Sequence, residues 1–236
     1  MSHYQTLLID LDHTLLDSDG SEAAAFADTL AAVGVAEAAQ HLATYRHING
    51  VLWREVERGT LSAPQVRVLR FEKLVAKLGL SADAHVMAED YAHGLGANGD
   101  LYPGARDALE ALAPAVPMAL VTNGLSDIQR ARINRLEIGH YFDAIIISGE
   151  IGVAKPHPRF FDHTFEKMSQ PDKATTLMVG DSLSADMRGG HHYGIATCWY
   201  NADGERSAGE QRDQITHEIT HLDQLPGLVL APNTAR

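Results

Sequence analysis

Two aspartates, one residue apart, follow the first apolar run of the chain. Leu7, Leu8 and Ile9 have the character of a buried strand, and Asp10 and Asp12 come directly after it. A carboxylate near a buried strand costs free energy unless a cation or hydrogen bonds compensate it. Aspartate is also common in turns, so the pair alone fits a solvated turn as well as it fits chemistry. The ends of the later strands decide between the two.

Four more apolar runs have polar residues at their ends. They cover residues 118–124, 144–150, 176–182 and 195–201. Helix-like segments lie between them, and strands that alternate with helices predict a parallel sheet covered on both faces. We therefore predict an α/β fold with a doubly wound parallel sheet.

Ligands of such sheets bind beyond the carboxyl ends of the strands. The chain places three carboxylates, a hydroxyl, an amide and an ammonium at or near those ends: Asp10, Asp12, Asp181, Thr122, Asn123 and Lys155. Clustered carboxylates suit Mg²⁺, and a hydroxyl and an ammonium suit the non-bridging oxygens of a phosphate. An aspartate can also act as a nucleophile that forms an acyl phosphate. The set predicts phosphoryl transfer, although Asn123 could only shape a turn and Lys155 could lie on the surface.

The segment between the first two predicted strands has helical character. Apolar residues recur at helical spacing, as at Leu52 and Val56, and Ser62 with Pro64 is typical of a helix start. We predict four helices that form an inserted all-α domain over residues 17–96. Residues 1–16 and 97–236 would then form the α/β core domain, with a glycine-bearing return linker that begins at residue 94.

Two short motifs match binding signatures but lack the context that these signatures need. "GLGANG" at 94–99 fits the dinucleotide pattern but follows a helix-like segment, so we interpret it as a flexible hinge. "HEITH" at 217–221 fits the zinc-protease pattern, but its β-branched residues favour an edge strand followed by a short helix. That arrangement would separate His217 from His221, so we expect neither a dinucleotide nor zinc.

Composition and charge limit the possible partners. The 236 residues are 45% hydrophobic, 21% charged and carry a net charge of −12, which disfavours nucleic-acid polymers and anionic membranes as partners. No apolar run approaches the roughly 18 residues needed to span a bilayer. The single cysteine, Cys198, lies in an apolar run and is expected to be buried and inert. The absence of a disulfide framework predicts a cytoplasmic location, whereas the oligomeric state is not predicted.

Four segments resemble, in order, the signature motifs of the haloacid dehalogenase superfamily. They are "DLDHT", "VTNG", "GVAKPHP" and "MVGDSLSAD", and the resemblance extends over essentially the whole chain, including the α-helical cap. It implies that Asp10 is the nucleophile and Asp12 the general acid and base. It also implies that Thr122 and Lys155 bind the phosphate.

The same resemblance implies Mg²⁺ as the cofactor. Asp10, Asp181 and the backbone carbonyl of Asp12 would hold the ion, and Asp186 would support it either directly or through water. Asp186 is also compatible with a purely structural bond within a helix.

Asp12 distinguishes between activities within the superfamily. Haloacid dehalogenases resemble this chain in fold but lack an aspartate two positions after the nucleophile, because a halide leaving group needs no proton and an alkoxide does. The pair therefore favours a phosphatase over a 2-haloacid dehalogenase. A non-catalytic binding protein, the other alternative, would be expected to have lost the nucleophile or a metal ligand.

Two longer segments indicate the substrate. Residues 48–74 and 179–201 resemble bacterial pyrimidine 5′-nucleotidases of the house-cleaning type, so we expect a small phosphomonoester, a pyrimidine nucleoside 5′-monophosphate. Phosphosugar phosphatases such as the acylneuraminate-9-phosphatases are the main alternative. Four cap residues could either stack on a base or form the core of the helices: Tyr45, Trp53, Arg70 and Phe71.

Overall fold

Six parallel strands form the central sheet of the computed structural model, which describes residues 4–204 and 206–230. They are β1 (Thr6–Ile9), β2 (Met118–Thr122), β3 (Ala144–Ile147), β4 (Thr176–Gly180), β5 (Ala196–Tyr200) and β6 (His217–Ile219). Their order in the sheet is β3-β2-β1-β4-β5-β6. β1 lies between β2 and β4, with Ile9 opposite both Leu120 and Val179. The predicted doubly wound α/β fold is confirmed.

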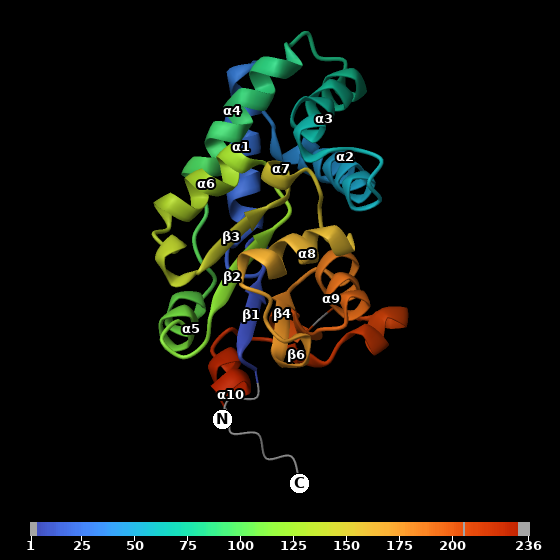
Figure 1. The fold of residues 1–236 in the computed structure, drawn as a ribbon. Coiled ribbons are helices and arrows are strands. Elements are labelled where there is room, and N and C mark those ends of the chain that lie inside the picture. The colour runs from blue at the N-terminus through green and yellow to red at the C-terminus, as the bar shows by residue number, and fades with distance from the viewer. Residues whose placement is uncertain (1–3, 205, 231–236) are drawn as a thin grey trace.

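Helices cover both faces of this sheet (Figure 1). Leu7 and Ile9 pack on one face with α5 and α10, and Leu8 packs on the other with α8 and α9. The bounds of these helices are α5 (Ala105–Leu112), α8 (Pro158–Lys167), α9 (Arg188–Tyr193) and α10 (Gln224–Leu230). Successive strand residues face opposite sides, so a strand buried on both sides is continuously apolar. This explains why the strands could be recognised as short apolar runs.

Four helices follow β1 and stand above the carboxyl ends of the strands (Figure 1). They are α1 (Ser18–Ala32), α2 (Ala39–Glu57), α3 (Ala63–Leu78) and α4 (Ala84–Ala97), which confirms the four predicted helices. α6 (Ser126–Arg135) and α7 (Ser148–Ile151), which follow β2 and β3, lie between them and the sheet. The division into two domains at residues 16 and 97 stays a prediction.

An aromatic cluster, with one ring from each of α1 to α4, forms the core of these helices. The ring of Tyr45 lies 4.7 Å from Phe26, 5.3 Å from Tyr91 and 5.7 Å from Phe71, measured between centroids. Tyr45 and Phe71 are fully buried in this cluster. For these two base-stacking candidates the alternative, a place in the helical core, is confirmed.

Several expectations about single segments are also confirmed. α3 begins after Ser62, whose backbone nitrogen donates to the side chain of Gln65 in a capping box. His217 lies in the edge strand β6, while His221 lies in the turn before α10. Cys198 is buried, and burial raises the pKa of its thiol to about 12. None of the helices in the described part of the chain combines the length and hydropathy needed to cross a bilayer.

The prediction of a flexible hinge at residues 94–99 is wrong for the first four of these residues, which are the last four residues of α4. The reason is the close approach of α4 to α1. A Cβ added at Gly94 would lie 2.8 Å from the Cβ of Ala25 and 3.0 Å from its Cα. Gly94 therefore allows α4 and α1 to pack closely. In the sequence, a glycine needed for such packing cannot be distinguished from a glycine in a flexible segment.

We predict that Gly94→Ala destabilises the protein by about 1–2 kcal/mol, because overpacking at the contact outweighs the better helix propensity of alanine. Gly50→Ala in α2 is the matched control, since the nearest atom to its added Cβ is the flexible end of Arg54 at 3.4 Å. That substitution should be neutral or stabilising by up to about 1 kcal/mol. Denaturant unfolding followed by circular dichroism measures both, and equal stability of the two variants would contradict the packing role.

Candidate active site

Three carboxylates meet beyond the carboxyl ends of β1 and β4. Asp10 follows β1, Asp181 follows β4, and Asp186 lies in the π-helical turn Leu183–Met187. One oxygen atom from each lies within 4.8 Å of the others. Gly180 permits this arrangement, because a Cβ at that position would collide with the carboxylate of Asp186. The sheet thus brings together three of the four predicted metal ligands through their side chains.

Lys155 is the counter-charge of this acidic triad. Its ammonium donates to Oδ1 of Asp10 at 2.6 Å, to Oδ1 of Asp186 at 2.7 Å and to the carbonyl of Val121 at 2.7 Å. The side chain is only 2% exposed, so the alternative of a surface lysine is wrong. Burial by itself disfavours the charged lysine, but the two carboxylates raise its pKa above the ordinary value. Lys155 is therefore charged at neutral pH.

The acidic triad has an excess of negative charge. Burial raises the pKa of Asp10 well above its usual range, and the carboxylates of Asp186 and Asp181 raise it further against the opposing effect of Lys155. Burial and Asp186 raise the pKa of Asp181 to about 6. Three carboxylates face two cations, the buried ammonium of Lys155 and the partly exposed guanidinium of Arg206, which pairs with Asp181 at 3.1 Å. One negative charge is left over, and oxygen ligands of this kind fit a hard divalent cation such as Mg²⁺. The backbone carbonyl of Asp12 as a further ligand stays a prediction.

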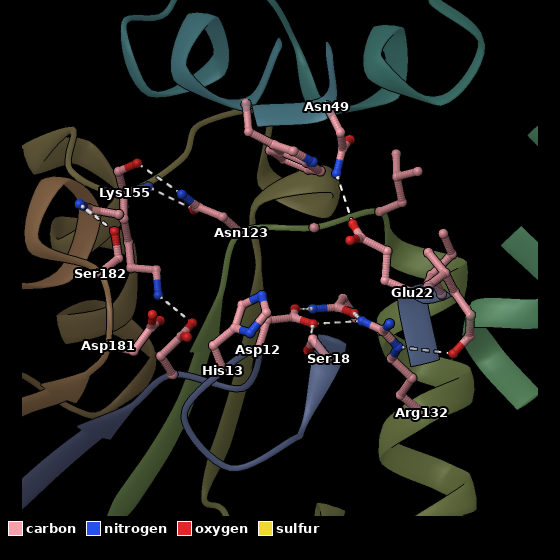
Figure 2. A pocket seen from close by; sticks show the side chains of 18 of the residues that line it. Asp12, His13, Ser18, Glu22, Asn49, Asn123, Arg132, Lys155, Asp181 and Ser182 are labelled. Atoms are coloured by element: carbon pink, nitrogen blue, oxygen red, sulfur yellow. Dashed lines mark hydrogen bonds and ion pairs between the residues drawn. The ribbon is translucent and has the colours of Figure 1, made fainter. Parts of the chain in front are cut away.

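Asn123 holds the backbone of Lys155. Its Nδ2 donates to the Lys155 carbonyl, and its Oδ1 accepts from the Lys155 amide, both at 2.9 Å. Figure 2 shows the two side by side at the cavity. With both ends of its amide used in this way, Asn123 positions the lysine in this structure, and a direct role toward a ligand stays a prediction.

Asp12 lies in a cage of three side chains that sequence analysis did not identify (Figure 2). Its Oδ1 accepts from Ser18 Oγ and from an Arg132 Nη atom, both at 2.6 Å, and its Oδ2 accepts from Gln129 Nε2 at 2.6 Å. Burial alone would raise the pKa of Asp12, but Arg132, Ser18 and Gln129 together lower it below its ordinary value. Asp12 is therefore ionised in this arrangement.

Thr122 lies behind this cage. It is fully buried at the end of β2, and its hydroxyl accepts a hydrogen bond of 2.7 Å from Gln129 Nε2. The same amide nitrogen thus joins Thr122 to Asp12. A phosphate-binding role of Thr122 stays a prediction.

Arg132 connects Asp12 to the helices above the sheet. Besides its ion pair with Asp12, its guanidinium donates to the Leu95 carbonyl of α4 at 3.0 Å and to the Ser21 hydroxyl of α1 at 3.2 Å. Gln129 and Arg132 are three residues apart in α6 and so lie on one face of this helix. The signal that could have found them is a pair of polar residues at this spacing in the helix after β2.

A cavity of about 250 Å³ lies between the acidic triad and the four upper helices. Its core side includes the predicted site residues Asp10, Asp12, Asn123, Lys155, Asp181 and Asp186. Its cap side includes Glu22, Asn49, Trp53, Glu57, Arg70 and Tyr91. Trp53 and Arg70, unlike the other two base-stacking candidates, are thus at the cavity wall. The volume suits a small molecule, and the aromatic rings of Trp53 and Tyr91 both lie on the cap side.

A buried acidic triad that includes the lysine-held Asp10, and the caged carboxylate of Asp12, lie together at the wall of one cavity at the edge of a parallel sheet. A family model for haloacid dehalogenase-like hydrolases matches residues 4–194. The chain therefore belongs to the haloacid dehalogenase-like hydrolases, as the four sequence motifs predicted.

Individual relatives agree with this assignment. The chain is 33% identical to the HAD-hydrolase YfnB of Bacillus subtilis over 99% of both proteins. A magnesium-bound crystal structure of YfnB superposes with a TM-score of 0.86 and covers 95% of this chain and 98% of its own chain. It is 35% identical to the pyrimidine 5′-nucleotidase PynA of Streptococcus pneumoniae over 84% of each protein. It is 32% identical to the pyrimidine 5′-nucleotidase YjjG of Escherichia coli over 79% of this chain and 83% of that protein.

We predict that about 10 mM Mg²⁺ raises the melting temperature by about 2–6 °C, because an ion that binds the folded state stabilises it by mass action. Asp181→Asn should remove most of this rise. Asp213→Asn, which changes an exposed carboxylate outside the acidic triad, is the matched control and should keep it. Differential scanning calorimetry with and without EDTA gives the values, and an unchanged response in Asp181→Asn would show that the ion binds elsewhere.

Proposed function

We propose that this protein is a Mg²⁺-dependent phosphomonoesterase that uses an aspartyl-phosphate intermediate and acts on pyrimidine nucleoside 5′-monophosphates. The observation that carries the phosphatase part is the arrangement of Asp10 and Asp12 at the wall of one cavity. Asp10 is held by Lys155 at 2.6 Å and Asp12 by its cage of hydrogen bonds. The nucleotidase part is supported by the two relatives with that activity.

Asp10 is the proposed nucleophile. One of its oxygens attacks the phosphorus, the bond from phosphorus to the ester oxygen breaks, and the phosphoryl group is transferred to Asp10 as an acyl phosphate. Water then attacks the acyl phosphate and releases inorganic phosphate and the free carboxylate. Lys155 favours the ionised form of Asp10 against the effect of burial and orients the carboxylate before the attack. Mg²⁺ at the acidic triad would neutralise charge on the phosphoryl oxygens.

Asp12 is the proposed general acid and base. It would give a proton to the leaving ester oxygen in the first step and take one from the attacking water in the second. Arg132 favours the ionised form needed for the second step. The negative charge of a phosphate nearby favours the protonated form needed for the first, because like charges raise the pKa of a carboxyl. A halide leaving group would need no such proton, so Asp12 argues against a dehalogenase.

The cavity supports a small monophosphate as the substrate. A volume of about 250 Å³ beneath four helices leaves no room for a polymer, and the cap side offers an aromatic ring and polar groups to a leaving group of nucleoside size. The net charge of −12 also disfavours polyanions such as nucleic acids.

We predict that kcat/KM with Mg²⁺ is at least about tenfold higher for UMP, dUMP and dTMP than for AMP, GMP, hexose phosphates or acylneuraminate 9-phosphate, a difference of about 1.4 kcal/mol. The measurement is phosphate release under one set of conditions. A preference for a sugar phosphate would be compatible with the proposed mechanism but would make a phosphosugar, and not a nucleotide, the substrate. Release of chloride from 2-haloacids without phosphatase activity would overturn the proposal.

We predict that Asp10→Asn loses more than about 10³-fold in kcat while it keeps its fold, since an amide cannot replace the nucleophilic carboxylate. Rapid acid quench of the wild-type protein with a ³²P-labelled substrate should trap a phosphoryl group on Asp10. Asp17→Asn, which changes a capping residue of α1, is a control for the loss of a nearby carboxylate. Sustained turnover by Asp10→Asn, with deamidation excluded by mass spectrometry, would remove Asp10 from this role.

A further inference from the structure

Each of the four upper helices contributes a side chain to the cap side of the cavity. α1 gives Glu22, α2 gives Asn49 and Trp53, α3 gives Arg70, and α4 gives Tyr91. This wall lies opposite the phosphate chemistry, at the place where a leaving group would lie. The hydrogen-bond donors and acceptors of this wall therefore influence which leaving group can bind.

Arg70 is a buried cation with an unused donor. It is 2% exposed, and its guanidinium carbon lies 4.5 Å from the ring centroid of Tyr91 and 5.5 Å from that of Phe71. Its Nε donates to the Arg67 carbonyl at 3.3 Å. Its Nη2 is buried and makes no direct hydrogen bond among the described residues, and neither does the hydroxyl of Tyr45, which interacts with the same guanidinium. A buried donor left unpaired costs free energy, so a ligand that offers an acceptor would bind here favourably.

Asn49 presents the complementary group. Its Nδ2 donates to Oε2 of Glu22 at 3.5 Å, but its Oδ1 is buried and has no hydrogen-bond partner in the described part of the chain. Figure 2 shows Asn49 extending from the helices above toward Glu22, on the side of the cavity away from Asp181. The wall therefore has one unpaired cationic donor and one unpaired neutral acceptor.

A pyrimidine base offers what both groups lack. Every pyrimidine base of the common nucleotides has a ring carbonyl oxygen, and its edge also has an N–H donor, at the ring nitrogen of uracil or the amino group of cytosine. Adenine has no carbonyl oxygen and could offer Arg70 only a ring nitrogen. Guanine has a carbonyl beside an N–H, so these two groups separate a pyrimidine from adenine, and only the second ring of guanine separates it from a pyrimidine. A carboxylate on the leaving group would satisfy Arg70 but would meet Glu22 and Glu57 on the same wall and leave Asn49 unpaired.

We infer that Arg70 and Asn49 are the specificity-determining residues of this cavity: Arg70 donates to a ring carbonyl of a pyrimidine base, and Asn49 accepts from its N–H edge. Trp53 provides an aromatic side chain on the same wall. This inference rests on the proposed nucleotidase function and names the residues that select the base. A hydrogen bond of this kind separates substrates that have the group from those that lack it.

The test compares UMP, AMP and ribose 5-phosphate, which lacks a base, as substrates of the Mg²⁺-loaded protein. Arg70→Gln should lower kcat/KM for UMP by about 10- to 100-fold, the range for a hydrogen bond to a charged group, and change the other two by less than about threefold. Arg70→Lys should retain part of the UMP activity. Asn49→Ala should lose about 5- to 10-fold on UMP alone. Arg58→Gln removes an exposed cation that pairs with Glu55 and is the matched control. It should leave kcat/KM for all three substrates unchanged.

Equal losses on all three substrates in Arg70→Gln and Asn49→Ala would overturn the inference, because they would show that both residues only support the helices. Since Arg70 is buried, circular dichroism checks each variant. If Arg70→Gln does not fold, the test uses Asn49→Ala, with uridine as an inhibitor. Weaker inhibition of Asn49→Ala than of the wild type supports the inference, and equal inhibition overturns it. The wild-type values test the proposed function separately, since a preference for ribose 5-phosphate over UMP would reject the nucleotidase before any variant is compared.

Discussion

The buried ammonium of Lys155 is the interaction on which the site depends. It donates to Asp10 after β1, to the Val121 carbonyl in β2 and to Asp186 beyond β4, so that one cation joins three neighbouring strands of the sheet. Two carboxylates would otherwise repel each other in a buried place, and removing one partner of a buried ion pair typically costs about 3–5 kcal/mol. Asn123 holds the lysine backbone in turn. The position of the Asp10 carboxylate therefore follows from the sheet and not from a loop alone.

The two walls of the cavity differ in the kind of group that a ligand must supply. The core wall has more negative charge than its lysine balances, which suits a cation, whereas the cap wall has a guanidinium without an acceptor. The chain carries a net charge of −12, so binding of an anionic substrate would depend on a cation at the acidic triad and on the guanidinium of the cap wall. In the proposed phosphatase this arrangement separates two tasks: the sheet edge would provide charge for the phosphoryl group, and the helices would provide shape and hydrogen bonds for the leaving group.

Side chains at strand ends were predictable from sequence because a parallel sheet brings all carboxyl ends to one edge. Asp10, Asp181 and Lys155 were found in this way. Gln129 and Arg132 were missed because the face that α6 turns toward Asp12 depends on how the helix docks. The same limit applies in the cap: Tyr45 and Phe71 enter its core while Trp53 and Arg70 reach the cavity, although all four lie on amphipathic helices. Gly94 could not be told from a hinge residue without its contact to Ala25.

The bonds of Arg132 have a consequence for the modularity of the protein. Its guanidinium contacts Asp12 in the core together with Leu95 and Ser21 in two of the upper helices. A chimaera that exchanged only α1 to α4 for the helices of a relative would leave Arg132 against a foreign surface and would disturb the carboxylate that it holds. The smallest unit that can be transplanted is therefore the four helices together with α6. A chimaera with a new substrate range would then also take over the residues that surround Asp12 in the donor protein.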